Sequence, residues 1–178
     1  MTRIHIIGGP GSGKTTLARR FSTRLDLPFY ELDIIGWEGG FGSERSPEAR
    51  LHDIKQIAIH PYWVTEGSFL GWTEELFRTA DYIIWLDLPW PIAAWRIILR
   101  HARASLAGNN RHRGLLKLWR FLLGTRGYYY SKAGSNHTRG KAAEYVATYG
   151  NKLIQCRRPS DVETCFNDLV TNVQRLSL

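Results

Sequence analysis

The feature that most constrains this chain is residues 8–15, Gly-Gly-Pro-Gly-Ser-Gly-Lys-Thr, which match every fixed position of the pattern G-x-x-x-x-G-K-[ST]. Before this motif, residues 3–7 alternate and then run apolar, as a short buried strand does. After it, apolar residues recur at helical spacing: Leu17, Ala18, Phe21 and Leu25. A motif of this kind is credible between a strand and a helix, and here both neighbours are present.

The residue types of the motif suit a loop that wraps around a phosphate, a P-loop. Glycines allow the backbone conformations that turn N–H groups inward, and the following helix adds the positive end of its dipole. Lys14 can reach the β- and γ-phosphates, and the Thr15 hydroxyl can bind Mg²⁺. The alternative is an ordinary glycine-rich turn with a solvated lysine. We predict a site for a nucleoside triphosphate, taken to be ATP. Its binding residues are Gly8, Gly9, Pro10, Gly11, Ser12, Gly13, Lys14, Thr15 and Thr16.

The net charge of +8 is concentrated in one segment. Residues 88–143 contain no Asp or Glu, but they contain eight arginines and three lysines, so the rest of the chain has 13 basic and 16 acidic residues. The basic positions are Arg96, Arg100, Arg103, Arg111, Arg113, Lys117, Arg120, Arg126, Lys132, Arg139 and Lys141. A surplus so localised needs a specific explanation.

With 178 residues, the chain is expected to form one domain, residues 1–178, that is large enough to bury a core. The first apolar run is the strand before the P-loop, so we expect no signal peptide. No stretch approaches the roughly 18 apolar residues that a membrane span needs, and we expect no membrane partner. Two cysteines are too few for a disulfide framework, and a cytoplasmic location fits them.

Further strands and helices are expected to alternate along the chain. Strands are predicted at residues 29–33, 62–65, 82–86 and 152–156, and helices at 46–59, 73–80, 92–103, 115–123 and 160–176. Residues 34–45 read as a glycine-rich mobile loop, in which Trp37 either stacks on a base or packs the loop down. Residues 124–138 are rich in Gly, Tyr and Ser and carry no clear pattern. The alternation predicts an α/β fold, a parallel sheet covered on both faces.

Asp33, Glu66 and Asp87 each end a predicted strand. In an open α/β sheet that edge binds ligands, and the P-loop lies on the same edge. We therefore expect these carboxylates to converge on the phosphates, with Glu66 and Thr15 beside Mg²⁺ and Asp33 orienting or deprotonating the acceptor. Each acid could instead cap a helix or pair with an arginine, and Asp87 before Pro89 could simply end its strand.

The basic segment has three interpretations. Arginines neutralise charge during phosphoryl transfer, so Arg96 and Arg100 could project from one helix, and Arg111 and Arg113 from a lid at about residues 104–140. Residues 96–141 could instead bind nucleic acid through phosphate contacts and aromatic stacking. The third interpretation is a solvated basic face.

The P-loop sequence from Ile7 to Thr16 resembles that of adenylate-kinase-like proteins. Later blocks resemble one branch of that group, the DNA topology modulation proteins. These blocks are Glu-Leu-Asp at residues 31–33 followed by Trp37, Trp-Val-Thr-Glu-Gly at residues 63–67, and Trp-Leu-Asp-Leu-Pro at residues 85–89 followed by Arg96 and Arg100. They occur in the family's order over about residues 1–105.

The resemblance implies a three-layer α/β/α P-loop fold of the nucleoside-monophosphate-kinase type, with five parallel strands in the order 2-3-1-4-5 and a basic lid. It implies Lys14 on the phosphates, Thr15 on Mg²⁺ and arginines in the lid. The chain departs from the family at Glu66-Gly67, where Asp-Gly is usual, so the reach of the acid is altered.

Taken together, the sequence predicts a P-loop kinase that transfers the γ-phosphoryl group of ATP to a small acceptor, which is a nucleotide, nucleoside or metabolite. Lys14, Asp33, Arg96, Arg100, Arg111 and Arg113 are its predicted catalytic residues, and Thr15 and Glu66 its metal-binding residues. The alternative is a nucleotide-dependent DNA-binding regulator with weak ATPase activity.

Overall fold

The computed structural model describes residues 1–40, 42–106, 114–130 and 138–175. Five parallel strands form one sheet in the order β2-β3-β1-β4-β5, which confirms the predicted order. The strands are β1 (Thr2–Gly8), β2 (Phe29–Glu31), β3 (Tyr62–Gly67), β4 (Tyr82–Leu86) and β5 (Leu153–Cys156). β1 lies at the centre, so the P-loop that follows it emerges at the middle of the sheet edge.

Helices connect the strands. They are α1 (Lys14–Leu25), α2 (Leu32–Gly36), the 3-10 helix η1 (Glu38–Gly40), α3 (Pro47–Ile59), α4 (Glu74–Thr79), α5 (Trp90–Leu106), α6 (Leu115–Tyr130), α7 (Arg139–Ala147) and α8 (Pro159–Arg175). The predicted start of α3 is confirmed: Ser46 is its N-cap, and the Ser46 hydroxyl accepts a hydrogen bond from the Ala49 N–H at 3.2 Å.

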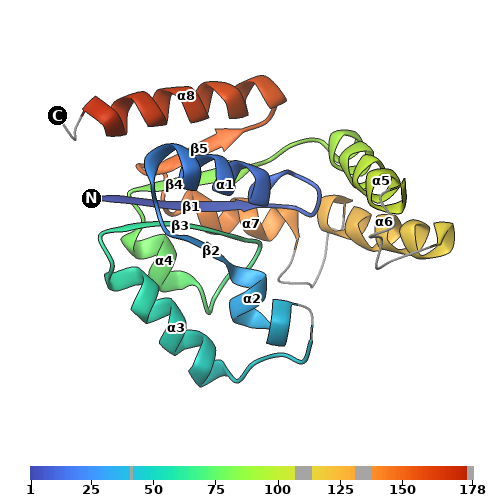
Figure 1. Ribbon diagram of the computed structural model, residues 1–178, viewed down its shortest axis with the longest axis horizontal. Coiled ribbons are helices and arrows are strands. Elements are labelled where there is room, and N and C mark those ends of the chain that lie inside the picture. The colour runs from blue at the N-terminus through green and yellow to red at the C-terminus, as the bar shows by residue number, and fades with distance from the viewer. Residues whose placement is uncertain (41, 107–113, 131–137, 176–178) are drawn as a thin grey trace.

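Two apolar cores make this a three-layer α/β/α fold, as predicted. Helices α1 and α8 pack on one face of the sheet around Phe21 and Leu169, and α3, α4 and α7 pack on the other around Trp63 and Phe77. Figure 1 shows these layers, with α5 and α6 beyond the edge of the sheet where α1 begins. The central strands are therefore buried on both faces, which fits their nearly continuous apolar sequence.

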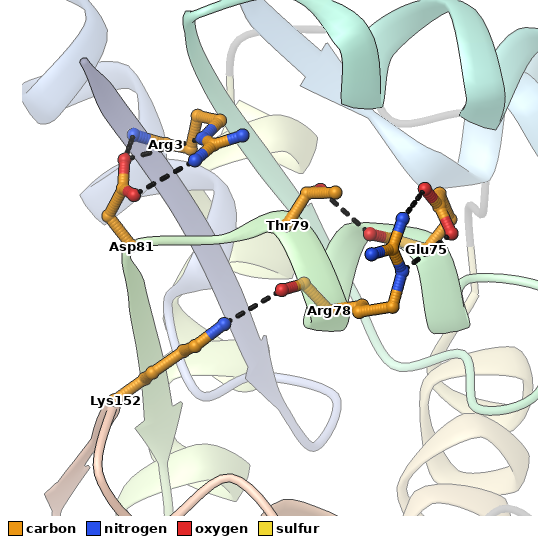
Figure 2. Close-up of polar contacts among 6 residues, drawn as sticks. All are labelled: Arg3, Glu75, Arg78, Thr79, Asp81 and Lys152. Atoms are coloured by element: carbon orange, nitrogen blue, oxygen red, sulfur yellow. Dashed lines mark hydrogen bonds and ion pairs between the residues drawn. The ribbon is translucent and has the colours of Figure 1, made fainter.

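The opposite edge of the sheet is held by polar contacts among the strand starts (Figure 2). Arg3 of β1 donates to the Asp81 carboxylate, with 3.1 Å between Nη2 and Oδ1. Lys152, just before β5, donates from Nζ to the Arg78 carbonyl at 2.7 Å and so ties α4 to the far side of the sheet. These contacts fix the strand starts and leave the carboxyl ends, near the P-loop, free for a site.

The structure differs from the expectations at four places. The strand predicted at residues 29–33 ends at Glu31, and Asp33 lies in the helix α2. The helix predicted at residues 115–123 runs on to Tyr130, although Gly124 and Gly127 lower its intrinsic propensity. The helix α7 was not predicted, although Thr138 caps it by accepting from the Lys141 N–H at 3.2 Å. Within residues 34–45, α2 and η1 replace the predicted loop.

Candidate phosphate-binding site

The P-loop backbone has the shape that its glycines were predicted to allow. Gly11 and Gly13 have φ angles of 77° and 96°, in the region that favours glycine. A Cβ atom at Gly11 would lie 2.7 Å from the Ala93 carbonyl oxygen of α5, so the loop also needs glycine for close approach. Since α1 begins at Lys14, its first N–H groups have no intrahelical acceptor and point toward an anion at the loop.

Two hydroxyl groups complete the surroundings of the loop. Ser68, after β3, donates to the Gly8 carbonyl at 2.6 Å and holds the start of the loop. The Ser12 hydroxyl is buried and has no partner among the described residues. An orphaned buried donor in the P-loop fits a ligand that accepts hydrogen bonds, as a phosphate does. Thr16 lies exposed on the first turn of α1.

Lys14 lies among three charged side chains. Its Nζ atom donates to the Gly9 carbonyl at 3.3 Å, so the side chain folds back over the loop. Burial lowers the pKa of Lys14, while the negative charges of Glu66 and Asp33 raise it and the positive charge of Arg100 lowers it. The ammonium group is thus partly stripped of water, a state that a bound polyphosphate would stabilise.

Thr15 and Glu66 are in direct contact. The Thr15 hydroxyl donates to Oε1 of Glu66 at 2.8 Å. The contact follows from the register, because Glu66 of β3 lies opposite Ile6 of β1 and Thr15 follows β1 after one loop. Glu66 is buried, and this desolvation raises its pKa, whereas Lys14 and the Thr15 hydrogen bond lower it. These two oxygen groups suit Mg²⁺. Among the described residues no group of three His, Cys, Asp or Glu could hold a metal by itself, so the remaining ligands of the ion would be phosphate and water.

Asp33 reaches the same site from α2. Its carboxylate is partly exposed, and desolvation raises its pKa, while Lys14 lowers it and Glu31 raises it. Asp33 lies two residues beyond the end of β2, and its charge and that of Glu66 both act on Lys14. Its role at the site stays a prediction.

The arginines of α5 approach the loop from its outer side. Arg96 donates from Nη1 to the Ser12 carbonyl at 2.5 Å, so its guanidinium already touches the P-loop backbone. Arg100, one turn further along the helix, is exposed, and its charge acts on Lys14. Arg111 and Arg113 lie outside the described residues.

Asp87 pairs with an arginine, which was the stated alternative to its convergence on the phosphates with the other two acids. Its carboxylate accepts two hydrogen bonds from Arg139, of 2.5 Å from Nε and 2.7 Å from Nη2, and a third from Gln155 at 2.9 Å. The Asp87 side chain is 1% exposed. This acid therefore ties the start of α7 to β4 and β5. Arg139 was noted only as one basic residue among eleven, and no local signal in the sequence indicates its partner.

Two tyrosines at the end of α6 cover the P-loop, a contact that the sequence did not reveal. Tyr129 donates from its hydroxyl to the Pro10 carbonyl at 3.0 Å. A Cβ atom at Gly9 would lie 2.5 Å from the Tyr128 ring, so Gly9 lets α6 pack directly on the loop. Burial raises the pKa of Tyr128 to about 12, so its hydroxyl is protonated at neutral pH.

Trp37 packs the segment after α2, which was one of its two predicted roles. Its ring lies 5.0 Å from that of Phe69, which in turn lies 5.2 Å from that of Trp72. Arg50 of α3 stacks over Trp72, with 5.4 Å from Cζ to the ring centre. This aromatic group packs the segment after α2 against the core.

No model of a known protein family matches the chain. The chain is 33% identical over 107 residues to the uncharacterized protein YqaC of Bacillus subtilis (strain 168), which covers 60% of this chain and 59% of that protein. It is 39% identical over 61 residues to shikimate kinase of Paracidovorax citrulli (strain AAC00-1), which covers 32% of this chain and 33% of that enzyme. These matches therefore span less than two thirds of either relative.

Two solved structures are similar over almost the whole chain. Shikimate kinase from Bacteroides thetaiotaomicron has a TM-score of 0.52 at 18% identity, covering 97% of this chain and 98% of that one. A gluconokinase from Sinorhizobium meliloti 1021 has a TM-score of 0.50 at 17% identity, covering 99% and 98%. The chain thus has the fold of the P-loop kinases, as the adenylate-kinase-like pattern predicted. The resemblance to DNA topology modulation proteins stays a prediction.

Proposed function

We propose that the chain is a P-loop kinase that transfers the γ-phosphoryl group of ATP, with Mg²⁺, to a hydroxyl group of a small acceptor. One observation carries the proposal. Lys14, the Thr15–Glu66 pair and Asp33 meet at the carboxyl edge of the sheet, beside the free N–H groups of α1. Lys14 and the Thr15–Glu66 pair suit a nucleoside triphosphate with its metal ion, and Asp33 suits the hydroxyl group of an acceptor.

The residues of the loop divide the work of binding and charge stabilisation. The P-loop N–H groups and Lys14 would hold the β- and γ-phosphates, and Thr15 and Glu66 would hold Mg²⁺ with its water, a cation that neutralises phosphate charge. Arg96 and Arg100 would supply positive charge from α5, and Arg111 and Arg113 would do so from a lid at about residues 104–140.

Asp33 would act on the acceptor. The acceptor oxygen bonds to the γ-phosphorus while the bond from that phosphorus to the β,γ-bridging oxygen breaks, and ADP leaves. The hydroxyl proton passes to the Asp33 carboxylate and then to solvent. Because desolvation raises the pKa of Asp33, this carboxylate is a stronger base than a fully hydrated one.

The acceptor is proposed to be a small hydroxylated metabolite, nucleoside or nucleotide. Shikimate kinase and gluconokinase, whose folds are similar, are named for small hydroxylated acids. The aromatic group of Trp37, Phe69 and Trp72 begins one helical turn after Asp33, and the Trp37 backbone N–H donates to the Asp33 carbonyl at 3.0 Å. It would give the acceptor an apolar face to pack against.

Steady-state kinetics with substituted protein test these roles separately. Lys14→Ala should abolish both ATP binding and turnover. Asp33→Asn should leave ATP binding intact and lower kcat by about 10²–10⁴-fold, the usual contribution of a general base. Asp168→Asn, which removes an exposed carboxylate of α8, serves as the matched control and should behave as wild type. Full turnover in Lys14→Ala would refute the proposed function.

A further inference from the structure

An apolar stripe runs along the solvent side of α6. It consists of side chains that are 49–81% exposed: Leu115, Leu116, Trp119, Leu123 and Tyr130. At about 100° per residue these five positions fall within about 100° of the helix circumference. We call this surface the α6 stripe. An apolar arc of this width normally faces a core, yet this one faces water.

The other side of α6 already has its packing partners. Thr125 is buried, and Tyr128 and Tyr129 lie against the P-loop. Tyr129 also contacts Trp90 of α5, with 5.4 Å between ring centres. The helix packs mainly by this face, on which Phe121 is 47% exposed, and the side chains of the α6 stripe are exposed on the other face.

Positive charge borders the α6 stripe. Arg120 lies beside it on the helix, and Arg126 lies within the same arc, with its Cζ atom 5.6 Å from the Tyr130 ring centre. Residues 88–143 contain no Asp or Glu, so α6 has no acid of its own to balance these cations. Leucine and tryptophan flanked by lysine and arginine are the composition of helices that lie in the interface of an anionic membrane.

We propose that the α6 stripe docks on the surface of an anionic phospholipid bilayer. Trp119 and the leucines would enter the boundary between headgroups and acyl chains, and Arg120 and Arg126 would contact lipid phosphates. Within the described residues no helix is long and apolar enough to cross a membrane. The expectation of no membrane partner rested on the lack of a span, and contact with a bilayer surface needs none.

Charge and polarity favour an anionic bilayer over two other partners of the α6 stripe, a second copy of the chain and nucleic acid. A second copy seated on the same stripe would bring the cations of both copies together, which opposes association. Nucleic acid would match the cations, but it would leave Leu115, Leu116 and Leu123 without apolar partners, since phosphates and base edges offer none. A surface that is anionic outside and apolar beneath matches both the apolar side chains of the α6 stripe and the cations beside them.

Vesicle co-sedimentation of the full-length protein, without nucleotide, tests the proposal. The protein should bind vesicles of phosphatidylcholine mixed with phosphatidylglycerol, and hardly bind phosphatidylcholine alone. Binding should weaken as salt is raised. The double variant Trp119→Ser/Leu123→Ser should reduce the partition coefficient at least about tenfold, and Arg120→Gln/Arg126→Gln should reduce it about fivefold per charge.

Matched variants on other elements separate the α6 stripe from general effects. Leu51→Ser/Ile59→Ser removes exposed apolar side chains from α3, and Arg24→Gln/Lys55→Gln removes two exposed charges from α1 and α3. The α3 pair should leave binding unchanged, and the charge pair should reduce it less than Arg120→Gln/Arg126→Gln does. Circular dichroism checks that every variant is folded.

Several outcomes overturn the proposal. These are failure to bind anionic vesicles, wild-type binding by Trp119→Ser/Leu123→Ser, or equal binding to neutral and anionic vesicles. A dimer in solution that dissociates in this variant would assign the stripe to a second copy. Duplex DNA that binds wild type and is lost in the same variant would assign it to nucleic acid.

Discussion

The ion pair between Arg139 and Asp87 allows a stability prediction with a defined size. Arg139→Met removes both charged hydrogen bonds but keeps much of the side chain's length. The Asp87 carboxylate, 1% exposed, then keeps one side-chain donor, Gln155. Breaking a fully buried pair costs about 3–5 kcal/mol. Because the Arg139 side chain is 47% exposed and water can replace part of it, we expect a loss of about 2–3 kcal/mol.

Urea unfolding followed by circular dichroism measures this loss, with an unchanged m-value as the check on two-state behaviour. The melting temperature should fall by about 4–12 °C for a chain of this length. Arg20 and Glu163 provide the control, because they also form two hydrogen bonds, of 2.6 and 2.7 Å from Nη1 and Nη2, but the Glu163 side chain is 57% exposed. Arg20→Met should cost less than about 1 kcal/mol. Equal losses in the two variants would refute the reasoning that burial of the carboxylate sets the cost.

Three further predictions concern pH, packing and the metal. Burial lowers the pKa of His5 to about 3, below its ordinary value of 6.5, so the native state excludes a proton that the unfolded chain binds. The free energy of unfolding should therefore fall by about 2 kcal/mol from pH 7 to pH 5. A His5 ring that titrates above pH 5 by NMR would contradict this. Gly9→Ala should destabilise the fold by about 1–3 kcal/mol, because its Cβ meets Tyr128. Gly124→Ala, with open space around it, should stabilise α6 by about 0.5–1 kcal/mol. Thermal melts that show the opposite order of stability would exclude this packing. Glu66→Gln should raise the Mg²⁺ concentration for half-maximal turnover about tenfold or more, and an unchanged requirement would remove Glu66 from the metal site.

Most of the fold could be predicted because its signals are local. The strand before the P-loop, the motif and the following helix are contiguous, and the apolar strands are buried on both faces. The end of α6 could not be predicted, because Gly124 and Gly127 disfavour a helix by propensity alone. Contacts of Tyr128 and Tyr129 with the P-loop, more than a hundred residues away in sequence, hold that end in place.

The candidate site was predictable where strand order decides proximity. Glu66 ends the strand beside β1, so its contact with Thr15 follows from a 2-3-1-4-5 sheet. Strand order did not reveal the partner of Asp87, because a position at a strand end does not say which side chain will pair with it. Its partner Arg139 lies 52 positions later in the chain, and only packing of α7 against the sheet brings the two together.

The central claim is that this chain moves the γ-phosphoryl group of ATP to a small hydroxylated acceptor. The most direct measurement incubates the purified protein with Mg²⁺ and γ-labelled ATP, together with a panel of hydroxylated acids, sugars, nucleosides and nucleotides. The account predicts that label appears on one acceptor, with one ADP formed per acceptor phosphorylated, and that Asp33→Asn abolishes this transfer while still binding ATP. Tight ATP binding with no labelled acceptor in the whole panel, or label released only as inorganic phosphate, would contradict it.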